Sequence, residues 1–192
     1  MTARPSAELP AGAVPPVRHP EAPGVGEQLI SHYAWCYGCG ANHQAGLHLL
    51  VFAGEGVSNR AELKVTEQHQ GAPGLAHGGL LAAALDETLG SLNWLLRQPA
   101  VTARLETDFI RPVPIGTTLY LRGEIVGVDG RKVYMTGEGR LDSPDGELAV
   151  AAAALFVAVP LTHFTTYGRA AEVAAARQSA AFGEVRSYEV NP

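Results

Sequence analysis

Apolar positions concentrate in one long segment of the chain, residues 76–98. Leucines recur there three or four positions apart, at Leu81, Leu85, Leu89, Leu92 and Leu96, and so fall on one helical face. Leu80, Trp94 and Leu95 widen that face, and Pro99 follows as a helix stop. The pattern predicts one apolar helix over residues 76–98 that is covered on most sides.

Strand-like segments lie on both sides of this helix. They are rich in apolar and β-branched residues and cover residues 47–53, 57–65, 100–110, 117–128, 131–141 and 147–159. Turn signals separate them, including Gly54-Glu55-Gly56, Asp129-Gly130 and Ser143-Pro144-Asp145-Gly146. The order of two strands, a helix and four strands does not suit a parallel βαβ sheet. It predicts an α+β fold in which a curved antiparallel sheet of about six strands wraps one central helix.

The remaining residues flank this unit. Residues 1–34 are rich in Pro, Ala and Gly near their start and are expected to form a flexible or loosely docked arm, with a short helical turn over residues 26–33. Residues 35–160 form the expected domain. Residues 161–192 form a C-terminal tail in which residues 168–181 have a helix-forming composition.

Net charge and hydropathy argue against nucleic acids and membranes as binding partners. The chain has 192 residues, a net charge of −5, a pI near 5.8 and two lysines, Lys64 and Lys132. A general nucleic-acid surface would need a basic patch, so none is expected. No apolar run approaches the ~20 residues that cross a bilayer, so no membrane partner is expected. The first residues show no secretory signal pattern, which predicts a cytoplasmic location.

Cys36 and Cys39 form a Cys-x-x-Cys pair, which could supply half of a zinc site. No second cysteine pair exists, and the histidines nearby, at positions 32, 43 and 48, are not spaced as a helical pair. A thioredoxin-like redox motif would sit in a βαβ unit, which is absent here. We therefore expect a reduced pair in a tight structural turn, and no metal.

Several short motifs occur in a characteristic order. They are Cys36-Tyr37-Gly38-Cys39-Gly40 with Asn42 and Gly46-Leu47, His69-Gln70-Gly71 with Pro73-Gly74, His77-Gly78-Gly79 with Asp86 nine residues after the histidine, Phe109-Ile110-Arg111-Pro112-Val113-Pro114, and a final Ala-rich strand that ends in Phe156-Val157. A lone His-Gly-Gly is weak evidence, but this combination over residues 35–159 is specific. The chain resembles the PaaI-type acyl-CoA thioesterases of the hot-dog fold.

Two positions in the central helix suit thioester chemistry. A helix N-terminus offers free N–H groups to a developing oxyanion, and a glycine there admits a ligand close to the backbone. The resemblance implies that Gly78 supplies this donor and that Asp86 is the catalytic carboxylate, as nucleophile or as general base on water. Small or neutral residues surround Asp86 on the helix, namely Gly79, Ala82, Ala83, Gly90 and Asn93. Such a stripe suggests close approach by another backbone or by substrate. Glu87 is the runner-up carboxylate or a surface charge.

Further site residues are predicted with open alternatives. His77 could act as an acid or base, or could orient the loop or cap the helix. Gln70 lies where relatives place a polar side chain toward the thioester, and Thr102 aligns with a family hydroxyl. Strand alternation places Thr102 on the face opposite Leu105 and Phe109. Arg111 could hold coenzyme A phosphates or be a solvated arginine. Gly79, Glu87, Asn93 and Arg111 are the predicted substrate-binding residues.

The spacing of Gly78 and Asp86 predicts a dimer. Eight residues correspond to about 12 Å along a helix. Reacting atoms must lie within about 3.5 Å of one another, so one helix cannot bring both groups to one thioester. Two antiparallel copies could, with Gly78 of one chain facing Asp86 of the other. The family is similar in this respect, and its dimers often pair into tetramers.

The leading hypothesis is a homo-oligomeric hydrolase of acyl-CoA or carrier-protein thioesters that needs no metal and no cofactor. A non-catalytic domain that binds an acyl group or CoA is the alternative. A hot-dog dehydratase would require His77 and Asp86 to act together, and the glycine pair fits thioester polarisation better.

Overall fold

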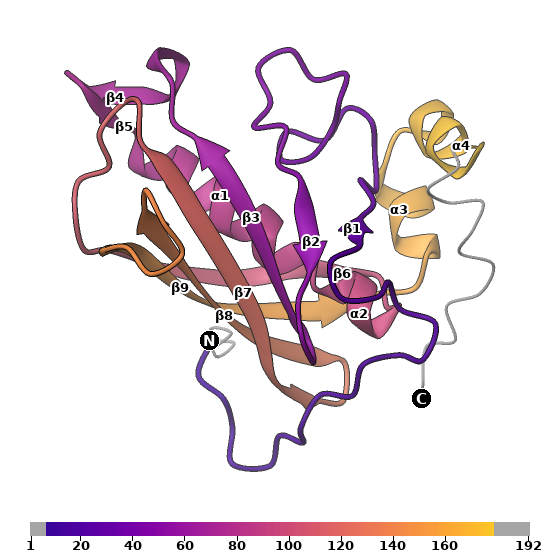
Figure 1. Cartoon of the computed structure of the whole chain (residues 1–192). Helices are drawn as coiled ribbons and strands as arrows, with labels where there is room; N and C mark the ends of the chain where they lie inside the picture. Colours follow the sequence, from indigo (N-terminus) through magenta and orange to yellow (C-terminus); the bar gives the residue numbers. More distant parts are fainter. Residues whose placement is uncertain (1–6, 179–192) are drawn as a thin grey trace, which may run out of the picture.

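A seven-stranded antiparallel sheet curves around one helix in the computed structural model, which describes residues 7–178 (Figure 1). The strand order is β1-β2-β3-β7-β8-β9-β6. The strands are β1 (Gln28–Leu29), β2 (Val51–Ala53), β3 (Ser58–Lys64), β6 (Ala100–Phe109), β7 (Thr118–Asp129), β8 (Lys132–Leu141) and β9 (Leu148–Ala158). The predicted hot-dog arrangement, with all six predicted strands, is confirmed.

The core lies between the sheet and helix α1 (Gly78–Gly90). Leu85 and Leu89 of α1 are fully buried against β7 and β8, and Gly123 and Gly137 of those strands leave room for the Leu89 side chain. A Cβ at Gly137 would stand 3.1 Å from Leu89, which is tighter than ordinary packing. The leucine face and the small residues opposite it therefore fix how deeply the helix sits in the sheet.

The single helix predicted over residues 76–98 is wrong at its C-terminal end. α1 stops at Gly90, and a separate short helix, α2 (Asn93–Leu96), follows. Buried Asn59 of β3 donates to the Thr88 carbonyl at 2.6 Å, and the Asn93 side chain donates to the Gly90 carbonyl at 2.9 Å. These side chains satisfy carbonyls at the helix end, so the helix need not continue.

The segment before the domain also differs from expectation. Residues 26–33 contain strand β1, which pairs with β2, where a helical turn was predicted. Upstream, Val14 forms a bridge with Val128 of β7, and Arg18 donates to the carbonyls of Gly54 and Gly56. Residues 7–27 thus run along the outside of the sheet.

A small hairpin and two C-terminal helices complete the fold. The polar loop before α1 contains the 3₁₀ helix η1 (Glu67–His69) and strands β4 (Gln70–Ala72) and β5 (Leu75–Ala76). After β9 come α3 (Thr162–Tyr167) and α4 (Ala170–Gln178), so part of the predicted tail helix is present; residues 179–181 lie outside the described residues. Among residues 7–178 no helix has the length and apolarity to cross a membrane.

Candidate active site

Asp86 and Thr102 meet where α1 packs on the edge strand β6. The Thr102 hydroxyl donates to Asp86 Oδ1 at 2.8 Å. Asp86 is half-buried, and this partial burial raises the pKa of its carboxyl above the ordinary range, while the Thr102 hydrogen bond acts in the opposite direction. Within residues 7–178, Asp86 forms no salt bridge. The carboxylate is therefore held in place without being neutralised.

A β-bulge in β6 places Thr102 and Phe109 on the same face of the strand. In the pairing with β9, Thr102 opposes Phe156 and Arg104 opposes Leu155, so Ala103 is the extra residue. Beyond the bulge, each side chain of β6 points to the face opposite to the one that simple alternation from Thr102 would give it. As a result Phe109, seven residues after Thr102, also faces α1, with its ring 3.4 Å from where a Cβ on Gly78 would stand. The prediction that Thr102 and Phe109 lie on opposite faces is wrong for this reason.

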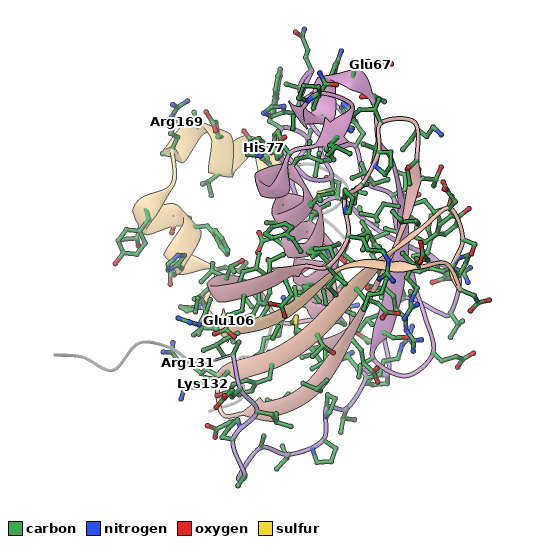
Figure 2. The ribbon with its side chains drawn as sticks, turned by 90° about the vertical axis from the view of Figure 1, so that its left-hand side faces the viewer. Glu67, His77, Glu106, Arg131, Lys132 and Arg169 are labelled. Carbon is green, nitrogen blue, oxygen red and sulfur yellow. The ribbon has the colours of Figure 1, made fainter. Side chains whose placement is uncertain are left out.

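His77 caps the N-terminus of α1. Its Nδ1 accepts a hydrogen bond of 2.9 Å from the Gly79 N–H, and its backbone N–H donates to the His69 carbonyl. Figure 2 labels His77 at this end of the helix. Of the alternatives weighed for His77, the structure shows the capping role. Because the cap occupies the Gly79 amide, Gly79 has no free donor for a ligand.

The Gly78 amide remains available at the same helix end. Within the described part of the chain, its N–H donates to no other group. Gly78 lines a cavity of about 420 Å³ whose wall is formed by the β4–β5 hairpin, the start of α1 and the end of β6 with the segment after it. An unpaired amide at a helix N-terminus, next to a cavity, suits the binding of an anionic or carbonyl oxygen.

Arg111 also lines this cavity, and Gln70 directly precedes the lining residue Gly71. Arg111 has its Nε 3.3 Å from Glu147 Oε1 and one guanidinium N–H donating to the Leu148 carbonyl. Gln70 is exposed on β4, and its Oε1 accepts from the Gly74 N–H at 2.8 Å. That bond closes the hairpin beside Gly71, where a Cβ would overlap His77.

Asn93 and Glu87 are not brought to the cavity or to Asp86. Buried Asn93 binds the Gly90 carbonyl at the start of α2. Glu87, although adjacent to Asp86, points to the Cys-x-x-Cys turn, where its Oε2 lies 3.3 Å from Cys36 Sγ. Adjacent helix residues diverge by about 100°, which separates the two carboxylates.

Asp86 itself does not line the cavity that contains Gly78. The structure thus separates two groups along α1: the Gly78 amide with a cavity at the N-terminal end, and the Asp86 carboxylate with the Thr102 hydroxyl about two turns further on. Sequence spacing predicted this separation. The sequence did not predict that the Phe109 ring would lie against Gly78. The β-bulge that turns the ring in this direction leaves no clear signal in the alternation of apolar and polar residues along β6.

Comparison with known proteins agrees with this architecture. A solved structure of a thioesterase superfamily protein is 32% identical, covers 71% of this chain and 70% of its own, and superposes with a TM-score of 0.61. The chain belongs to the thioesterase superfamily. The family model described as Thioesterase superfamily matches residues 73–147, which include α1 and strands β6 to β8.

Two other known proteins extend the likeness. The PaaI protein of Escherichia coli, from the phenylacetic acid degradation operon, shares the fold with a TM-score of 0.55 at 17% identity, over 59% of this chain and 81% of its own. Acyl-coenzyme A thioesterase THEM4 of Xenopus laevis is 33% identical over 88 residues, which are 46% of this chain and 39% of that relative. The chain thus matches well under half the length of that curated relative. The resemblance to PaaI-type hot-dog thioesterases is confirmed.

Proposed function

We propose that this chain hydrolyses an acyl-CoA, or a carrier-protein thioester, to a free acid and a thiol. The observation that carries the proposal is the Asp86 carboxylate, which is half-buried, fixed by Thr102 and free of a neutralising cation within residues 7–178. Such a carboxylate can attack a thioester carbon or accept a proton from water. The name of the THEM4 relative points to coenzyme A thioesters as the substrate class.

The Gly78 amide is the proposed electrophilic group. As the carbonyl carbon becomes tetrahedral, its oxygen gains negative charge, and an unpaired N–H at the positive end of a helix stabilises that charge. The cavity beside Gly78 has apolar walls from Leu75, Leu81 and Phe109, which suit an acyl or aryl group. Arg111 at the same cavity is the proposed contact for a CoA phosphate.

The complete site needs a second chain. Gly78 and Asp86 are about 12 Å apart along α1, and Asp86 lies outside the Gly78 cavity. β6 ends the sheet and pairs on one side only within the described residues, so its ten residues offer a free edge to another copy. Glu106 marks this strand in Figure 2. A dimer joined near β6 would bring Asp86 of one chain toward Gly78 of the other, and dimers could pair again as tetramers.

The test is a thiol-release assay on short, long and aryl acyl-CoAs with wild type, Asp86→Asn and a control, Glu62→Gln. Glu62 is exposed on β3. We expect release with wild type and Glu62→Gln and strongly reduced release with Asp86→Asn. Wild-type turnover in Asp86→Asn would refute the proposed role of the carboxylate. Absence of release by wild type from the whole panel would favour acyl binding without catalysis.

A further inference from the structure

Four metal-ligating side chains from two distant parts of the sequence meet beside α1. They are His32, Cys36, Cys39 and Glu87, and one ligand atom of each lies within 4.8 Å of the others. Cys36 Sγ is 3.3 Å from Glu87 Oε2, and Cys39 Sγ is 3.6 Å from His32 Nδ1. Zinc bonds of about 2.0–2.3 Å in a tetrahedron place ligand atoms roughly 3.3–3.8 Å apart. The cluster therefore needs little contraction to surround a zinc ion.

The backbone of the Cys-x-x-Cys turn is shaped to receive the glutamate. Gly38 is buried between the two cysteines, and a Cβ there would stand only 2.2 Å from Glu87 Oε2. Glycine at this position lets the carboxylate lie directly over the turn. The Gly40 N–H donates to the Cys36 carbonyl, and the Leu49 N–H donates to the Gly38 carbonyl, so the turn is fixed independently of the side-chain cluster.

The donor atoms of the cluster suit a cation. Partial burial raises the pKa of the Glu87 carboxyl to about 7, with the neighbouring Cys36 adding to the rise. Among residues 7–178, no lysine or arginine forms a salt bridge with Glu87. Two sulfurs, a carboxyl oxygen and an imidazole nitrogen thus share a partly buried site to which, within the described residues, no lysine or arginine is paired through Glu87.

We propose that His32, Cys36, Cys39 and Glu87 bind one zinc ion in a closed structural site that fastens the Cys-x-x-Cys turn to α1. Two sulfurs, an imidazole nitrogen and a carboxylate oxygen are ligands that zinc accepts, and four protein ligands leave no position for a substrate. On binding, each cysteine that still carries a thiol proton releases it to solvent. The proposal departs from the sequence-based expectation of no metal, because the spacing of the cysteines and histidines gave no sign that Glu87 reaches them.

The proposed zinc site is separate from the Gly78 cavity, but one of its ligands is adjacent to Asp86 in α1. None of its four ligands lines the Gly78 cavity, so the ion is not placed to polarise a thioester there. Glu87 follows Asp86 directly in α1, so a bond between Glu87 and zinc would hold that turn of the helix, and Asp86 with it, against the loop.

Metal content tests the proposal directly. The 192-residue chain is produced with zinc and reductant, desalted, and analysed by elemental mass spectrometry. We expect about one zinc per chain in wild type and its loss in Cys36→Ser and Cys39→Ser. His32→Asn should also lose zinc, whereas the matched variant His48→Asn should keep it, because His48 lies outside the cluster. Equal zinc in wild type and in both cysteine variants would overturn the proposal.

A spectroscopic measurement on wild type tests the site even if the ligand variants fold poorly. Cobalt titrated into metal-free wild type should give the thiolate charge-transfer band and the intense visible bands of a tetrahedral site, with saturation near one equivalent. Absence of thiolate bands at one equivalent of cobalt would contradict the assignment. Asp86→Asn should retain zinc while losing turnover, so failure of the zinc site and failure of the proposed hydrolysis give different results.

Discussion

Thr102 on β6 and Asp86 on α1 are joined by a hydrogen bond of 2.8 Å that spans the packing of the helix on the edge strand. The bulge at Ala103 lets Thr102 and Phe109 share the face of β6 that meets the helix. The hydrogen bond holds one carboxylate oxygen and leaves the other available. The hydroxyl is thus a positioning group for Asp86, and the two residues should be tested together.

Replacing Asp86 with Asn should abolish most thioester hydrolysis while leaving the fold intact. The amide keeps the size of the side chain and can still accept from Thr102, but it is neither a base nor a nucleophile. We expect kcat to fall by about 10²-fold or more, in the range reported for loss of a general base. Steady-state thiol release measures this, with Glu62→Gln as the surface control. A fall in kcat of less than threefold would count against Asp86.

The acid side of the pH–rate profile should respond to Thr102. Hydrolysis needs the Asp86 carboxylate, so the rate falls as the pH drops through the pKa of Asp86, which partial burial raises. The Thr102 hydrogen bond lowers that pKa. Thr102→Val should therefore move the acid limb of kcat to higher pH, whereas Thr102→Ser, which retains the hydroxyl, should restore it. Superimposable limbs for wild type and Thr102→Val would show that the hydroxyl does not act through Asp86.

Adding a methyl group at Gly78 should impair catalysis more than folding. A Cβ there would stand 3.4 Å from the Phe109 ring, an ordinary contact, so α1 can form. The methyl would nevertheless occupy the mouth of the cavity beside the free amide, and we expect kcat/KM of Gly78→Ala to fall about tenfold or more. Gly12→Ala is the matched control, because nothing lies within 4 Å of its Cβ position. Unchanged kcat/KM would place the substrate away from Gly78.

Sequence patterns predicted the fold well because each predicted strand has turn signals at its ends and the leucine face is unambiguous. They failed where side chains override the local pattern. The helix ends early because Asn59, from a distant strand, takes the Thr88 carbonyl. Phe109 turns inward because of one extra residue at Ala103. Glu87 joins a cysteine turn 48 residues away in sequence, measured from Cys39, a contact that no local spacing encodes.

Glu87→Gln should change stability in opposite directions with and without zinc. A carboxyl whose folded pKa exceeds its ordinary value of 4.5 contributes stability at low pH, and this contribution is lost as the pH rises toward about 7. In chelator at pH 8, Glu87→Gln should therefore be more stable than wild type by on the order of 1 kcal/mol. With zinc, the variant lacks a ligand and should melt below wild type. Thermal melts in chelator and with zinc measure this. The same order of stability of Glu87→Gln and wild type under both conditions would contradict the zinc site.

Mixing two inactive chains tests whether the site is shared. In the proposed dimer, each site combines Gly78 of one chain with Asp86 of the other, so Gly78→Val and Asp86→Asn homodimers lack both intact sites. A mixed dimer has one site with both changes and one with neither, because the two-fold interface is reciprocal. Random reassortment should restore about a quarter of wild-type activity, since half of the dimers are mixed and each has one of two sites. We would measure thiol release after co-expression and separately confirm dimers by light scattering. Activity that stays at the level of the parent variants, despite mixed dimers, would show that Gly78 and Asp86 do not cooperate across the interface.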